Sequence, residues 1–141
     1  MPWHTVYDLR ADTDNVAAVQ RATLTTREYG IEPTNGRLFG SDEWWNEVAS
    51  GRLPVHTLTG TISRVFMGSM GDWPEFEMVC DDGSSLGFTR FQTPPDGSRD
   101  GLYKEGRRIE VDAVWQEARK AAPDWGIPRI RREVTAIRIA D

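Results

Sequence analysis

The residues that could do chemistry are few, and they lack the partners that catalysis needs. Cys80 is the only cysteine. A reactive thiol needs a neighbouring base or positive charge, whereas Cys80 is followed by Asp81 and Asp82. Its alternation with Phe76 and Met78 is typical of the buried face of a strand. We therefore expect Cys80 to be a small buried hydrophobe and not a nucleophile.

The remaining motifs also fail to supply a catalytic centre. The serines of GSMG (68–71) and DGSSLG (82–87) stand in turn contexts and not in the strand-to-helix elbow of hydrolases. GSMG lacks the Lys-Ser or Lys-Thr end of a phosphate loop. His4 and His56 lie too far apart for a local metal motif. The sequence therefore predicts no catalytic residue, no metal and no cofactor, and it favours a binding protein over an enzyme.

The composition is that of one globular domain with an acidic surface. The chain has 141 residues and a formal net charge of −5, which disfavours a protein whose main task is to grip a phosphate backbone. It has no apolar run of about 18 residues and no basic start followed by an apolar segment. We expect a single domain over residues 1–141, a cytoplasmic location and no membrane partner.

Two helices are predicted in the first part of the chain, residues 1–53. One begins after Asp12, whose side chain could cap it, and Gly30 is a plausible end. Its second half carries Thr23, Thr25 and Thr26, so the segment 23–31 could equally be extended. The other begins after Ser41 and ends at Gly51. It carries the adjacent tryptophans Trp44-Trp45, and aromatic residues at helical spacing usually pack in a core.

From residue 54 onward the apolar period changes to two, which predicts strands. The Asp-Gly pair in DDGSS (81–85) predicts a tight hairpin turn between two of them. In the fourth, the alternation predicts that Trp115 faces inward with Ala113. The five predicted strands cover residues 56–66, 75–80, 86–91, 107–116 and 133–140.

This pattern, with a long first strand that hairpins onward and an interruption before the last strand, resembles a small barrel of the OB type over residues 54–141. The resemblance implies an α+β fold, in which two N-terminal helices pack on a five-stranded antiparallel, barrel-like sheet. It also makes the connection after the first strand a loop that contacts ligands. An SH3-like barrel or a curved antiparallel sheet with helices on one face fits the same pattern.

That connection carries unusual side chains for a turn. It reads MGSMGDWPEF (67–76), and its apolar residues allow two interpretations. In one, Met67, Met70 and Trp73 form a contact surface, with Asp72 and Glu75 as its charged rim. In the other, the loop folds back and Trp73 plugs the end of the barrel. The first interpretation predicts a small acidic protein-binding module of inhibitor, immunity or adaptor type with a more basic protein partner.

Two other functions remain open at the level of sequence. A single-stranded nucleic-acid binder of the OB type would use the basic cluster of Arg129, Arg131 and Arg132. An enzyme of unknown class would need a pocket with perturbed titratable groups, which a sequence does not display.

Overall fold

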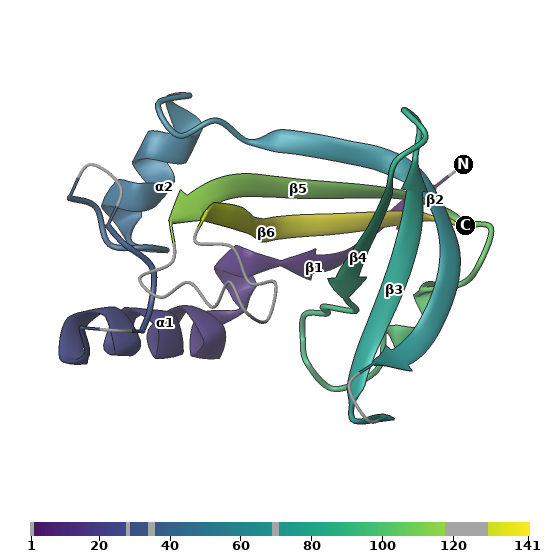
Figure 1. Ribbon diagram of the computed structural model, residues 1–141, viewed down its shortest axis with the longest axis horizontal. Coiled ribbons are helices and arrows are strands. Elements are labelled where there is room, and N and C mark those ends of the chain that lie inside the picture. Colours follow the sequence, from purple (N-terminus) through teal and green to yellow (C-terminus); the bar gives the residue numbers. More distant parts are fainter. Residues whose placement is uncertain (1, 28, 34–35, 69–70, 118–129) are drawn as a thin grey trace. The chain divides into compact units, whose positions relative to one another are not determined.

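The computed structural model describes residues 2–27, 29–33, 36–68, 71–117 and 130–141. Over these residues the chain has an α+β fold (Figure 1). The two helices are α1 (Thr13–Thr25) and α2 (Asp42–Ala49). The six strands are β1 (Trp3–Asp8), β2 (His56–Gly68), β3 (Trp73–Cys80), β4 (Ser85–Thr89), β5 (Arg108–Glu117) and β6 (Ile130–Ala140).

The strands form one open sheet in the order β1-β6-β5-β2-β3-β4. The pairings of β1 with β6, β2 with β3, and β3 with β4 are antiparallel. Two predictions need correction. The described strands number six and not five, because β1 was not predicted. In this strand order β1 and β4 are the two edges of the sheet, so the predicted barrel closure is wrong for the described strands.

Internal contacts divide the chain into two compact units. Unit 1 comprises residues 1–11, 57–112 and 135–141, and unit 2 comprises residues 12–56 and 113–134. Strands β5 and β6 contribute residues to both units.

The core of unit 1 is built mainly by alternate residues of its strands. Phe76 and Met78 on β3 are fully buried and Cys80 nearly so, which confirms the predicted face. The predicted hairpin after Cys80 is also present. Gly83 has a φ of +91°, and its N–H donates to the Cys80 carbonyl at 2.9 Å. The other fully buried large side chains of this unit are Val6, Tyr7, Leu9, Ile62, Ile109, Val111, Ile137 and Ile139.

Helix α2 of unit 2 follows its local sequence signals. The Ser41 hydroxyl accepts a hydrogen bond from the Trp44 N–H at 3.2 Å, and Gly51 adopts the left-handed conformation with a φ of +79°. The side chain of Trp44 is completely buried and meets Phe39 edge to face, so the predicted core role of this tryptophan is confirmed.

Helix α1 begins where it is predicted and ends earlier. It starts at Thr13 with Asp12 as its N-cap residue, although the Asp12 side chain accepts no cap hydrogen bond, and it stops at Thr25 instead of continuing to Gly30. Two threonine hydroxyls bond back to helix carbonyls, Thr23 to Val19 at 2.8 Å and Thr25 to Arg21 at 2.7 Å. Such back-bonding satisfies the hydroxyls but favours helix ends and bends over continuation.

Candidate functional site

The predicted contact loop is mostly strand. β2 continues to Gly68 and β3 already begins at Trp73, with Met67 paired to Pro74 and Gly68 paired to Trp73. Residues 69–70 lie outside the described residues, and the prediction for Met70 lies outside them too. Asp72 is exposed and directly precedes β3.

The register separates the predicted site residues onto two faces of the hairpin. Directly paired residues of an antiparallel ladder share a face, and successive residues alternate. Trp73 therefore shares one face with Glu75, whereas Met67 lies on the opposite face with Pro74. The expected single cluster of methionines and tryptophan is not formed by the described residues.

The side chain of Trp73 is displayed and not folded into a core. It is 55% exposed, which contradicts the interpretation of the loop as a plug. Its Nε1 donates to the Thr89 hydroxyl at 2.8 Å, which fixes the orientation of the ring over β4. The carboxylate of Glu75 lies over Gly68, where a Cβ would meet its Oε2 at 1.4 Å. An exposed aromatic ring and a carboxylate thus stand side by side at the end of a paired hairpin.

Further residues along the two strands extend this surface. Phe66 pairs with Glu75 and Arg64 pairs with Glu77, and the guanidinium of Arg64 lies 4.0 Å above the ring of Phe66. The surface combines apolar area with both signs of charge, as protein-binding surfaces do. We call it the hairpin face; it comprises Arg64, Phe66, Trp73, Glu75, Glu77 and Val79.

Met67 lies in a different environment, on the other side of the hairpin. Its Sδ lies 3.3 Å from Nη2 of Arg90. The Arg90 side chain is only 10% exposed, and its Nη1 donates to both carboxylate oxygens of Asp100 at 3.1 Å. Met67 therefore packs beside the largely buried guanidinium of Arg90, although half of its own surface is exposed.

The basic cluster of the nucleic-acid hypothesis is already engaged within unit 2. Arg129 lies outside the described residues. Arg131 donates from Nε to Glu133 at 3.2 Å. Arg132 lies 4.5 Å above the ring of Trp115 and donates from Nε to His56 at 3.1 Å. These contacts occupy guanidinium and ring surface that a stacked base would need.

Trp115 itself corrects a prediction. The alternation along β5 implied that it faces inward, but it is 49% exposed and stacks on His56. The reason is visible in the strand, where Ala113 and Val114 are both buried. Two consecutive buried residues shift the period by one position, so that Gln116 is buried in place of Trp115.

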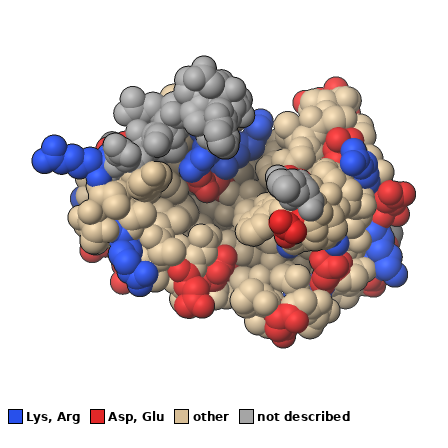
Figure 2. Space-filling model, turned by 60° about the horizontal axis from the view of Figure 1, so that its bottom comes forward, with Lys and Arg blue, Asp and Glu red and all other residues tan. Residues whose placement is uncertain are grey.

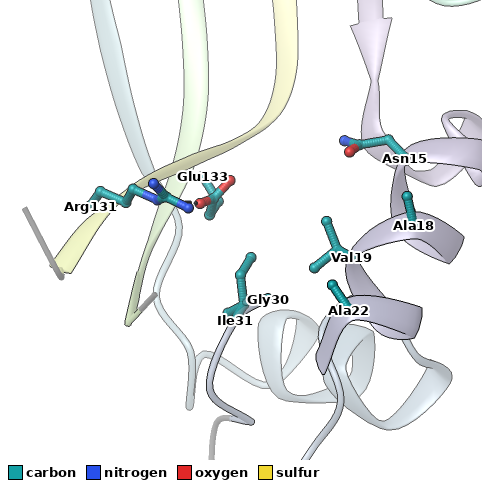
Figure 3. A pocket seen from close by; sticks show the side chains of 8 residues that line it. All are labelled: Asn15, Ala18, Val19, Ala22, Gly30, Ile31, Arg131 and Glu133. Carbon is teal, nitrogen blue, oxygen red and sulfur yellow. Dashed lines mark hydrogen bonds and ion pairs between the residues drawn. The ribbon is translucent and has the colours of Figure 1, made fainter. Parts of the chain in front are cut away.

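Unit 2 also contains a pocket that the sequence did not indicate (Figure 3). Its volume is about 380 Å³. One wall is a face of α1 with residues at the helical spacing i, i+3, i+4 and i+7, the opposite wall is the segment 30–31, and β6 supplies an ion pair at the edge. The lining residues are Asn15, Ala18, Val19, Ala22, Gly30, Ile31, Arg131 and Glu133.

Close packing at Thr23 holds the two apolar walls together. The Thr23 hydroxyl accepts a hydrogen bond from the Ile31 N–H at 3.1 Å. Gly30, with a φ of +94°, approaches so closely that a Cβ would lie 2.3 Å from this hydroxyl oxygen. Only glycine allows both the left-handed backbone and the close approach. The segment 30–31 is therefore held against α1 at this position.

The Glu133 carboxylate at the edge of the pocket is poorly hydrated. Its side chain is 26% exposed, and burial raises its pKa even though Arg131 acts in the opposite direction. The folded protein therefore holds a proton on Glu133 more tightly than the unfolded chain does. Ionised Glu133 costs stability at neutral pH, and this cost disappears as the pH falls through the raised pKa to the unfolded value.

We expect Glu133→Gln to be at least as stable as the parent protein at pH 7. The advantage of the variant should shrink as the pH is lowered and vanish by about pH 4.5, near the ordinary pKa of glutamate. Urea unfolding of both proteins between pH 4.5 and pH 7 measures the difference. A variant that loses stability at pH 7 and regains it at low pH would show that the ion pair outweighs the burial of the carboxylate.

The described residues show no arrangement typical of a metal or thiol centre. They contain no group of three or more His, Cys, Asp or Glu side chains that could hold a metal ion. Cys80 is buried, as expected. No described helix is both long and apolar enough to cross a bilayer. On the face shown in Figure 2, both acidic and basic side chains are exposed.

The described residues form a small α+β fold, with an exposed aromatic hairpin face in unit 1 and, in unit 2, a pocket edged by an ion pair. No curated protein matches the chain. The profile of one family, "Immunity protein RhsI2", matches residues 3–140. The match spans nearly all of the sequence, so the chain belongs to this family. It is a small immunity protein that binds a partner toxin protein, which confirms the immunity type among the functions that the sequence predicted.

Proposed function

We propose that the chain neutralises its partner toxin by binding it through the hairpin face, with Trp73 as the central contact. Membership of the immunity family carries the toxin-binding part of this proposal. The position of the contact rests on the exposure of Trp73 and on the hydrogen bond to Thr89 that orients its ring. Aromatic residues held in one orientation are typical binding hot spots, because little side-chain entropy is lost on association.

The charge of the hairpin face favours a basic toxin surface. Glu75 and Glu77 outnumber Arg64 on the face that carries Trp73, and the chain has a net charge of −5. Acidic groups around an apolar contact speed the encounter with a basic partner and disfavour acidic competitors. The predicted Asp72 adds a further exposed carboxylate beside Trp73. A cytoplasmic location, as the sequence predicts, is part of this proposal.

The test begins with the identification of the toxin. The purified chain is used as bait in a nuclease-treated lysate of the native host, and captured proteins are identified by mass spectrometry. Each captured protein is then produced in a sensitive host with and without the chain. We expect one captured protein to arrest growth alone and to be harmless with the chain, and the two purified proteins to form a stable complex.

Capture alone does not support the proposal, because only relief of toxicity shows immunity. Protection of growth without any complex between the purified proteins would overturn binding as the mechanism. The nucleic-acid alternative would be favoured instead if the purified chain, free of protein partners, bound single-stranded nucleic acid. Its affinity would then fall steeply as the salt concentration rises and would depend on Arg131 and Arg132.

A further inference from the structure

The pocket of Figure 3 joins an apolar surface to a charged edge. Its walls come from α1 and from the segment 30–31 and are apolar except for Asn15. Its edge holds Arg131 and Glu133, whose side chains point toward each other from β6 in Figure 3. A ligand that fills the pocket must satisfy both the aliphatic walls and the charged edge.

The ion pair at the edge leaves acceptor capacity on Glu133. Its Oε1 accepts the Nε–H of Arg131 at 3.2 Å, and no hydrogen-bond donor among the described residues reaches its Oε2. Arg131 is the more hydrated partner, with 42% of its side chain exposed against 26% for Glu133. The carboxylate is thus more desolvated than its cation, and burial raises its pKa despite the ion pair.

We propose that this pocket binds a lysine or arginine side chain of the partner toxin, with the charged head on Oε2 of Glu133 and the aliphatic stem along Ala18, Ala22 and Ile31. This inference rests on the proposed function, namely that the chain binds a toxin. Lysine and arginine bury their methylene stems on apolar surface while their heads stay at a polar edge. That division matches the two parts of the pocket.

Other side chains fit the pocket less well. An apolar side chain would remove the remaining water from Glu133 without supplying a donor, and burying an ionised group without a partner is costly. An acidic side chain would meet Arg131 but would also face the carboxylate of Glu133, and Arg131 is the more hydrated of the two and needs a further partner less. A cation offsets the desolvation of Glu133, and the negative net charge of the chain favours a basic partner at longer range.

The first measurement compares the affinity of the identified toxin for three variants. Glu133→Gln removes the charge at the edge, and Ala18→Leu fills the pocket from an exposed position of α1. We expect each to weaken binding by about tenfold or more, as loss of a hydrogen-bonded charge contact or of a filled pocket does. Glu105→Gln, at an exposed position of unit 1, changes the net charge equally and should alter the affinity less than about twofold.

The second measurement finds the basic residue on the toxin. Each exposed lysine and arginine of the toxin is replaced by alanine and tested against the parent chain and Glu133→Gln. We expect one toxin residue whose loss weakens binding about tenfold with the parent chain but less than about twofold with the variant, which identifies a direct contact.

The outcomes separate this inference from the proposed function. If the toxin binds the parent chain, Glu133→Gln and Ala18→Leu equally well, the pocket is not part of the interface and the inference is wrong, while toxin binding stands. The same conclusion follows if no basic residue of the toxin couples to Glu133. If no toxin binds the parent chain at all, the proposed function fails and this inference fails with it.

Discussion

Replacing Trp73 with alanine is expected to weaken toxin binding about 100-fold, which corresponds to about 2.7 kcal/mol. The side chain presents a large apolar ring that is more than half exposed and ready to be buried by a partner. Its Nε1–H already bonds to Thr89, so the ring loses little freedom on binding. Titration calorimetry with the purified toxin measures the affinity, and circular dichroism with thermal melting checks that the variant is folded.

Met67→Ala is the matched control for this experiment. Met67 lies at the same end of the hairpin and is about as exposed as Trp73, but it faces the opposite side, beside Arg90. We expect its replacement to change the affinity less than about threefold, because scattered contacts outside a hot spot contribute little. Equal losses for the two variants would show that the toxin encloses the end of the hairpin, and a loss for Met67→Ala alone would place the interface on the other face.

The separation of Met67 from Trp73 depends on one irregularity that the sequence does not announce. The register of β2 against β3 shifts between Ile62 and Arg64. Without that bulge, Phe66 would continue the buried face of Ile62; with it, Val65 takes that face opposite Phe76. Residue types alone predicted the hairpin and its apolar residues, but a one-residue slip decides which of them a partner can reach.

A second bulge explains why β1 was not predicted. Its register against β6 shifts between Thr5 and Tyr7, and Val6 and Tyr7 are buried in succession. The period of two that identifies a strand is therefore missing from this short segment. Its partner, β6, lies at the other end of the chain, so no local pattern indicates the pairing. The same non-local order of strands decided that the sheet is open and not closed.

Features controlled by neighbouring residues were predictable. Ser41 and Gly51 mark the two ends of α2, Ser41 through a hydrogen bond and Gly51 through a left-handed backbone conformation. Each of these features depends on the residue type at a single position. The hairpin turn at Gly83 follows from the same kind of signal. The pocket was not predictable, because Glu133 and Ala18 are more than one hundred residues apart and only the folded chain brings them together.

The largest effect on stability is expected for Trp44→Ala, about 4 kcal/mol. Trp44 is completely buried in unit 2 and packs edge to face on Phe39 at 4.9 Å between ring centroids. Its Nε1 donates to the side chain of Gln116 at 3.3 Å, and Gln116 is itself buried. Alanine would leave a large cavity and deprive a buried acceptor of this donor, and both effects destabilise the folded state. Urea unfolding monitored by circular dichroism gives the free energy.

A comparison with the adjacent tryptophan, Trp45, tests whether burial or residue type sets the loss of stability. Trp45 meets Trp44 edge to face at 4.7 Å but remains partly exposed, so Trp45→Ala should cost about 1 kcal/mol. Trp44→Phe keeps most of the ring volume and loses the donor to Gln116, and we expect a cost between the two. If Trp45→Ala proved as damaging as Trp44→Ala, the extent of burial would not be what sets the contribution of each tryptophan to the stability of unit 2.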